Sequence, residues 1–265
     1  MRRRALLLGT PLLLAAGAAP RNATTRHDLP PAALPLSRLD LPWWRARHNA
    51  VLERLRQPPV DLLLIGDSIT QDLERRGPLP QQDFGPVWNR FYAPRNAVNL
   101  GFKGDSTAHL LWRLQNGELD GIAPKAAQLL IGANNFGRVR WRAADTFTGI
   151  EAILAELRRR LPRMRIILLS VLPSRRSAWV DEQTLEVNRL LAARHKPAGD
   201  VRFGDIRFID VTAAFLKAGT LDPRAFYDGA LTPPDPLLHP SAAAWTRMAE
   251  MVEPTLSAMM NDRPR

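Results

Sequence analysis

The sequence predicts an α/β fold in which a parallel sheet is covered by helices on both faces. Strand-like and helix-like patterns alternate along the chain, and the strand candidates are short apolar runs with polar residues mainly at their ends. Such runs are typical of strands that are buried on both sides. The chain has 265 residues, with no internal repeat and no long linker, so we expect a single domain of this class.

Five segments are strand candidates because each is a short, mainly apolar run. The first is the clearest, since its apolar residues are interrupted only by Asp61. The five candidates are residues 61–65, 97–100, 127–131, 165–171 and 207–211.

Segments with helical spacing lie before, between and after these strands. In the first of them, Trp44, His48, Val51 and Leu55 fall on one side of a helix. The predicted helices are residues 43–55, 107–115, 144–161, 181–194 and 241–260. Because helices alternate with strands, the pattern favours a parallel sheet rather than an antiparallel one.

The first 19 residues predict a secretory signal peptide. Three arginines at 2–4 are followed by a short apolar stretch at 5–14 and by small residues at 16–19. The apolar stretch is short and Pro11 interrupts it, so we expect no stable membrane span, although an uncleaved anchor is the alternative. The prediction is therefore an exported protein, periplasmic or secreted.

After this segment we expect a loose Pro- and Ala-rich lead-in at 20–41, followed by the domain at 42–260. The chain contains no cysteine, which excludes disulfides and a lipid anchor on cysteine. The formal net charge is +11, which could indicate an anionic partner such as nucleic acid or an acidic polysaccharide. We favour a compositional bias toward arginine, because the arginines are scattered and no nucleic-acid motif is present.

The most informative motif is Gly66-Asp67-Ser68, directly after the first predicted strand. The carboxyl ends of strands are where α/β folds place ligands and chemistry, so Ser68 is a candidate nucleophile. The alternative is a simple helix N-cap, a position that serine favours. A second copy at 104–106 precedes a helical pattern and follows no long apolar run, so we expect Ser106 to be such a cap.

A nucleophilic serine needs donors for the oxyanion and a base for its proton. Gly104 follows the second strand and Asn134 the third, so both should lie at the same sheet edge as Ser68. Of the five histidines, one lies in the lead-in and three lie in or at the end of predicted helices: His27, His48, His109 and His195. His239 remains as the candidate base, in a loop that also contains Asp235.

These blocks, in this order, resemble the SGNH (GDSL-type) hydrolases over about residues 42–260. Within that family the chain is most similar to the branch of the platelet-activating-factor acetylhydrolase catalytic subunits. Three segments carry that closer match: residues 64–71, 99–102 and 111–119. The resemblance implies a flavodoxin-like, three-layer α/β/α fold with a five-stranded parallel sheet, and neither a metal nor an organic cofactor.

The resemblance also implies roles for single residues. Ser68 would be the nucleophile and His239 the base, oriented by Asp235. The N–H groups of Ser68 and Gly104 and the side chain of Asn134 would form the oxyanion hole.

Two positions depart from the family pattern. Asp235 lies four residues before His239 instead of three, and an inserted Pro236 would explain the difference. Either the loop bulges and still brings Asp235 to His239, or a backbone carbonyl orients the imidazole. Lys103 stands where the closest branch tends to have glycine, and we favour a surface substitution over a cation for an anionic substrate.

The sequence thus predicts an exported serine esterase that hydrolyses O-acyl esters, with acetyl the favoured acyl group. The expected partner is an acylated carbohydrate, as on extracellular or cell-wall polysaccharide, or a small ester, and no nucleic acid. The alternatives are an acyltransferase that uses the same site and an inactive binding or assembly protein. The sequence leaves the oligomeric state open.

Overall fold

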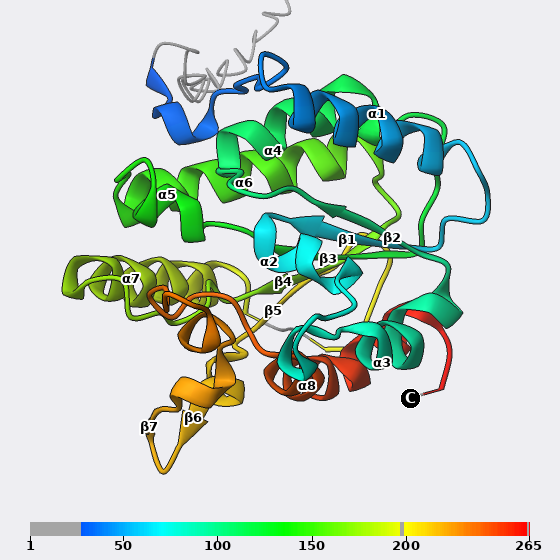
Figure 1. The fold of residues 1–265 in the computed structure, drawn as a ribbon. Helices are drawn as coiled ribbons and strands as arrows, with labels where there is room; N and C mark the ends of the chain where they lie inside the picture. The colour runs from blue at the N-terminus through cyan, green and yellow to red at the C-terminus, as the bar shows by residue number, and fades with distance from the viewer. Residues whose placement is uncertain (1–27, 197–198, 264) are drawn as a thin grey trace, which may run out of the picture.

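The computed structural model describes residues 28–196, 199–263 and 265, which form a five-stranded parallel sheet with helices on both faces (Figure 1). The strands are β1 (Leu62–Gly66), β2 (Ala97–Gly101), β3 (Ala126–Leu130), β4 (Arg165–Leu169) and β5 (Ile206–Ile209). Their spatial order is β2-β1-β3-β4-β5. The predicted fold class and all five predicted strands are confirmed, with bounds shifted by two residues at most.

The order in which the chain adds strands to the sheet changes direction at β1. From β1 the chain passes to β2 on one side and then to β3 on the other, so β1 lies at the switch point where α/β sheets bind ligands. Gly66, at the end of β1, pairs with Gly101 of β2 and with Leu130 of β3. The segments that follow these three strands therefore begin side by side.

Alternation along the strands divides the core into two layers. Leu63 and Ile65 belong to one apolar cluster, and Leu62 and Leu64 belong to the other. The first cluster contains residues of α1 (Pro42–Leu55), α4 (Thr107–Arg113), α6 (Ala143–Arg160) and α7 (Ala178–Arg194). The second contains residues of α2 (Ser68–Gln71), α3 (Gly85–Val87) and α8 (Ala242–Met260).

The longer helices agree with the periodicity of the sequence, whereas several short elements were not predicted. These are α2, α3, α5 (Ala133–Gly137), a two-stranded hairpin of β6 (Leu216–Lys217) and β7 (Thr220–Leu221), and several short 3₁₀ and π turns. Such elements contain fewer residues than a periodic pattern needs to be recognised. None of the described helices is long and apolar enough to cross a membrane.

The lead-in differs from the prediction of a loose segment in the part that the structure describes. Its 3₁₀ turn, Pro31–Ala33, packs on α4 and α6, and Ala32 is fully buried. The Thr107 hydroxyl donates to the Ala32 carbonyl over 2.7 Å, and the Leu36 N–H donates to the Ala108 carbonyl over 3.0 Å. The predicted signal peptide at 1–19 lies outside the described residues.

A buried guanidinium connects the strand ends to α4. Arg113 is fully buried, and its Nε and Nη1 donate to Asp105 over 2.8 Å and to Glu118 over 2.5 Å. Its Nη2 donates to the backbone carbonyls of Gly66, at 3.3 Å, and Leu100, at 3.2 Å. Burial alone would lower the pKa of Arg113, but the two carboxylates outweigh it and raise the pKa, so the group stays charged.

Helix α1 attaches to the same two carboxylates. Trp44 Nε1 donates to Asp105 over 2.9 Å, and His48 Nδ1 lies 3.3 Å from Glu118. The His48 ring stacks on Trp44 with a centroid separation of 5.6 Å. His48 is therefore a buried packing residue of α1 and does not belong to the site of Ser68.

Replacement of Arg113 by methionine should destabilise the fold strongly. It would leave Asp105 and Glu118 buried without their shared cation, a change that typically costs about 3–5 kcal/mol. Urea unfolding followed by circular dichroism measures this loss. Arg189→Met is the matched control, because Arg189 is exposed on α7 and, within the part of the chain that the structure describes, pairs with Glu186 of the same helix alone. It should cost less than about 0.5 kcal/mol. Equal stability of the two variants would contradict the role given to Arg113.

Candidate active site

Ser68 opens the short helix α2 directly beyond β1. Asp67 is the N-cap of this helix, and its carboxylate accepts from the Ile69 N–H over 3.0 Å. Ser68 is thus not the cap, which leaves its hydroxyl available. The turn needs glycine at position 66, because a Cβ there would lie 2.2 Å from Thr70 Oγ1 and 2.4 Å from the Leu130 carbonyl oxygen.

A line of hydrogen bonds runs from Ser68 through His239 to Asp228. Ser68 Oγ lies 3.1 Å from His239 Nε2, and His239 Nδ1 lies 2.7 Å from Asp228 Oδ1. A carboxylate can only accept, so Nδ1 carries the proton in the neutral ring and Nε2 accepts from the serine hydroxyl. The second oxygen of Asp228 accepts the backbone N–H groups of Leu238, at 2.8 Å, and His239, at 2.5 Å.

The prediction that Asp235 orients His239 is wrong. Asp235 is exposed, and its backbone N–H donates to the Asp228 carbonyl over 3.2 Å. The partner of the imidazole is Asp228, which is 2% exposed and lies eleven residues before His239. The loop folds back on itself, so the acid that contacts the ring is not the one nearest to it in sequence. The available signal was the position of Asp228 directly after the aromatic pair Phe226 and Tyr227, since such a pair favours burial.

Tyr227 is a further residue of this site that the sequence did not reveal. Its ring stacks on the His239 imidazole, with centroids 5.4 Å apart and planes inclined by 16°. The Tyr227 hydroxyl donates to Asp72 over 2.5 Å and accepts from Arg75 over 2.8 Å. Burial raises the pKa of Tyr227, so the phenol keeps its proton. The imidazole is thus held at its edge by Asp228 and across one face by Tyr227.

The surroundings of His239 and Asp67 shift the titration of both groups. Burial lowers the pKa of His239, but the hydrogen bond and charge of Asp228 outweigh burial, so the net shift is upward. Burial raises the pKa of Asp67 to about 7, against the opposing effects of the Ile69 N–H and of His239. Asp67 therefore exchanges its proton close to neutral pH, and His239 holds its proton to a higher pH than an ordinary histidine.

Gly104 and Asn134 lie at the same sheet edge as Ser68, as the strand order requires. Gly104 is buried, with φ of +76°, a conformation that favours glycine. Asn134 belongs to α5, and its Nδ2 donates to the Asp105 carbonyl over 3.0 Å and to Asp67 over a longer 3.3 Å. The side-chain amide of Asn134 thus joins the loop of Gly104 to the turn of Ser68.

The second Gly-Asp-Ser motif caps a helix, as predicted. Ser106 is the N-cap of α4, and its backbone N–H donates to His109 Nδ1 over 3.0 Å. Burial lowers the pKa of His109 to about 4, so this ring is neutral and accepts the bond. His195 is the C-cap of α7, and its Nε2 lies 2.5 Å from Glu151 Oε1 on α6. The histidine of the predicted lead-in, His27, lies outside the described residues.

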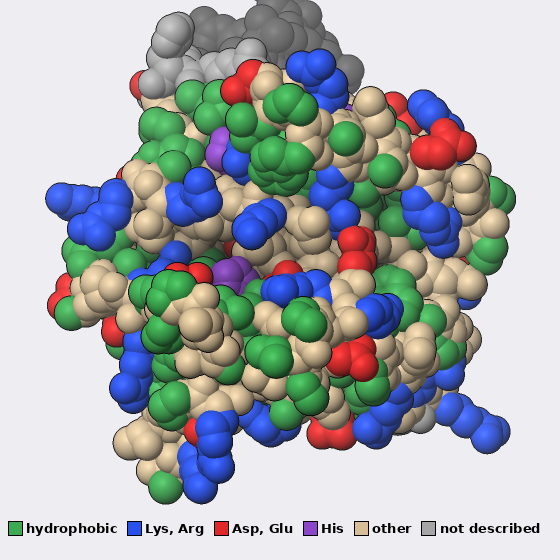
Figure 2. All heavy atoms as spheres, viewed as in Figure 1, with side chains coloured by type: hydrophobic (Ala, Val, Ile, Leu, Met, Phe, Trp, Pro, Cys, Tyr) green, Lys and Arg blue, Asp and Glu red, His purple; other side chains and the backbone are tan. Residues whose placement is uncertain are grey.

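The resulting arrangement can perform nucleophilic chemistry. A serine hydroxyl becomes a nucleophile when an imidazole takes its proton and a carboxylate orients that imidazole. Ser68, His239 and Asp228 are hydrogen-bonded in this order. Figure 2 shows a histidine side chain in a hollow near the middle of one face, with lysine and arginine side chains around it. Within the described ranges, no three His, Asp or Glu side chains are grouped in a way that could hold a metal ion.

Comparison with known proteins agrees with this geometry. Residues 64–244 match the model of the GDSL-like Lipase/Acylhydrolase family. The chain is 27% identical over 242 residues to the platelet-activating factor acetylhydrolase IB subunit alpha2 of Gallus gallus, covering 89% of this chain and 95% of that one. It is 31% identical over 187 residues to the alpha1 subunit of Homo sapiens, covering 70% and 74%.

The solved structures include a carbohydrate esterase family 3 protein from Talaromyces cellulolyticus. It superposes with a TM-score of 0.52 at 16% identity, over 77% of this chain and 100% of that one, and so shares the fold. The match of the family model covers the end of β1, the turn of Ser68 and the loop of His239 together. The chain therefore belongs to the GDSL-like lipase/acylhydrolase family, and the branch that its motifs resembled is the one to which its relatives belong.

Proposed function

We propose that this protein is a serine esterase that hydrolyses O-acyl esters through an acyl-enzyme. The observation that carries the proposal is the hydrogen-bonded line Ser68–His239–Asp228 at the carboxyl end of β1. Membership of an acylhydrolase family supports the same reaction class.

In the first half of the reaction, Ser68 Oγ attacks the ester carbonyl carbon while its proton passes to His239 Nε2. Asp228 stabilises the imidazolium through Nδ1. The bond to the leaving alcohol then breaks, and the alcohol oxygen takes the proton from Nε2. In the second half, water gives a proton to His239 and attacks the acyl-enzyme, which releases the acid and restores the serine hydroxyl.

The negative charge that develops on the carbonyl oxygen needs donors that are already in place. We assign these to the backbone N–H groups of Ser68 and Gly104 and to Nδ2 of Asn134. In the resting site both hydrogens of this amide are engaged, one with the Asp105 carbonyl and one with Asp67. The contact to Asp67 is the longer, at 3.3 Å, and is the one that we expect the oxyanion to replace.

For the substrate we propose short acyl groups, with acetyl first, on extracellular or cell-wall polysaccharide. The names of the relatives, which are acetylhydrolase subunits, support the acetyl group. The basic and apolar pattern at residues 2–14 supports export to the periplasm or the medium.

Removal of the Ser68 hydroxyl should abolish turnover. We expect Ser68→Ala to lower kcat/KM for p-nitrophenyl acetate by at least about 10³-fold, because the nucleophile is lost. Ser106→Ala, in the second Gly-Asp-Ser motif, is the matched control. It removes part of a helix cap, which costs about 1 kcal/mol of stability, and should leave the rate within a few fold. Unchanged turnover by Ser68→Ala would refute the esterase proposal.

The two candidate acids can be separated by isosteric amides. Asp228→Asn should lower kcat by about 10³- to 10⁴-fold, since an amide neither fixes the tautomer of His239 nor stabilises its cation. Asp235→Asn should change kcat less than about threefold, because Asp235 is exposed and does not contact the ring. Steady-state kinetics on p-nitrophenyl acetate measures both. The reverse order of effects would restore Asp235 as the acid.

The pH dependence follows from the state of His239. The base acts when neutral, so kcat/KM should rise with pH through a midpoint above the ordinary histidine pKa of about 6.5, because the net pKa shift is upward. In Asp228→Asn the burial effect remains while the carboxylate is lost, so the midpoint should move to lower pH. A midpoint that stays in place in this variant would show that Asp228 does not set the pKa.

A further inference from the structure

The mouth of the candidate active site carries two arginines that the proposed reaction does not use. Arg138 lies at the end of α5, where its N–H donates to the Asn134 carbonyl over 3.0 Å. Its Nη1 lies 3.3 Å from the position that a Cβ on Gly104 would occupy. This guanidinium thus lies directly beside one of the oxyanion-hole candidates.

Arg176 approaches the same residues from the segment between β4 and α7. Its Nη2 donates to the Ala133 carbonyl over 2.7 Å, one residue before Asn134. The tip of this side chain lies against Gly137, where a Cβ would meet its Nη1, so a side chain at 137 would require the guanidinium to move. Its Nε is buried and has no hydrogen-bond partner among the described residues.

Neither arginine forms an ion pair with a carboxylate of the described part of the chain, which sets them apart from Arg38 nearby. Arg38 lies against the same Gly104 but pairs with Asp105 over 3.1 Å. Burial lowers the pKa of Arg176, and the charges of Asp67, Asp181 and Asp228 oppose this shift. A half-buried guanidinium without an ion-paired carboxylate gains more from a ligand anion than an exposed one does.

The acids of the site do not supply that anion. The Asp228 carboxylate accepts hydrogen bonds from the His239 ring and from two backbone N–H groups, and the Asp67 carboxylate accepts from Ile69 and Asn134. Figure 2 shows lysine and arginine side chains at the rim of the hollow that holds a histidine. The hydrogen bonds of these two acids are therefore made to groups other than Arg138 and Arg176.

We propose that Arg138 and Arg176 form an anion subsite, which selects esters that carry a carboxylate or phosphate group close to the scissile acyl group. This inference rests on the proposed esterase function and narrows its substrate class. A planar guanidinium binds either oxyanion through paired N–H groups, so both anions share one chemistry here.

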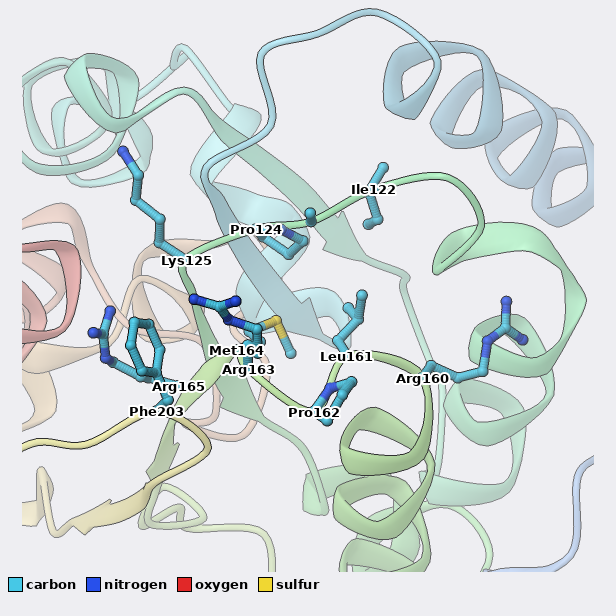
Figure 3. A pocket seen from close by; sticks show the side chains of 11 residues that line it. Ile122, Pro124, Lys125, Arg160, Leu161, Pro162, Arg163, Met164, Arg165 and Phe203 are labelled. Carbon is cyan, nitrogen blue, oxygen red and sulfur yellow. The ribbon is translucent and has the colours of Figure 1, made fainter.

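A second cationic cavity lies at the opposite end of the sheet and provides a control. It has a volume of about 510 Å³ and is lined by residues that precede β3 and β4, including Lys125 and Arg163 (Figure 3). Arg163 lies over the Phe203 ring, 4.8 Å from its centroid. Because this cavity adjoins the amino ends of the strands, it is separated from Ser68 by the length of the sheet.

The test compares three acetyl esters of one phenol framework: 4-acetoxybenzoate, 4-acetoxyphenyl phosphate and neutral methyl 4-acetoxybenzoate. The measured quantity is the ratio of kcat/KM for each anionic ester to that for the neutral ester. Intrinsic reactivity cancels when this ratio is compared between variants. We expect Arg138→Gln and Arg176→Gln each to lower the ratio by about 5- to 30-fold, the loss of one charge-assisted interaction.

Three further variants and conditions keep the test decisive. Arg176→Lys keeps the charge and should recover part of the ratio, which a purely structural defect would not allow. Arg163→Gln, in the remote cavity, should leave the ratio unchanged. Raising the salt to 0.5 M should lower the ratio in the wild type and have little effect in a variant that carries both Arg138→Gln and Arg176→Gln. Thermal melting of each variant shows whether it is folded.

The outcomes separate the two proposals. If all esters are hydrolysed and both Gln variants keep the ratio within twofold, the anion subsite is wrong and the esterase stands. If Arg163→Gln lowers the ratio equally, the preference for anionic esters comes from the overall positive charge of the protein, and the subsite is wrong. If no ester is hydrolysed, the esterase proposal fails. NMR titration of Ser68→Ala with 4-acetoxybenzoate then tests the subsite alone, since binding that Arg138→Gln does not weaken would overturn it.

Discussion

The buried guanidinium of Arg113 fixes how far the turn of Ser68 lies from the loop of Gly104. Its Nη2 donates to the carbonyls of Gly66, the last residue of β1, and Leu100, the last but one of β2, and its Nε donates to the carboxylate of Asp105, next to Gly104. These contacts lie in a low-dielectric interior, where loss of one of them would leave a costly unpaired group. The loop of Gly104 is thus fixed relative to the turn of Ser68 before any substrate arrives, and the proposed oxyanion hole needs this preorganisation.

The proposed base, His239, reaches this edge of the sheet from 171 residues beyond Ser68. No strand carries His239, so its position depends on the Asp228 carboxylate, which accepts from the ring and from two consecutive backbone N–H groups. The same three bonds fold the loop and select the tautomer of the imidazole. Tyr227 adds a ring face and ties the loop to Asp72, just beyond α2. The orientation of the imidazole and the folding of its loop therefore depend on the same three hydrogen bonds.

Those two halves of the site differ in how far the sequence could predict them. Ser68, Gly104 and Asn134 follow parallel strands, and the apolar runs that predict the strands also predict that their carboxyl ends meet. His239 was identified as the candidate base because the other four histidines lie in the lead-in or in, or at the end of, predicted helices. Asp235 was chosen by proximity in sequence, but the partner of a loop histidine depends on how the loop folds, and hydrophobic periodicity carries no information on that. The docked turn at Pro31–Ala33 was missed for the same reason, since its contacts are tertiary.

The distribution of arginine supports a compositional origin for most of the net positive charge. Several exposed arginines pair with an acid nearby in sequence, as Arg189 does with Glu186, Arg159 with Glu156 and Arg224 with Asp222. Such pairs contribute little to stability. Arg138 and Arg176 have no such acid partner in the described part of the chain, and they lie beside Gly104 and Asn134, where an anion bound to them would be close to the proposed oxyanion hole. The position of these two arginines is therefore more informative about function than the total charge.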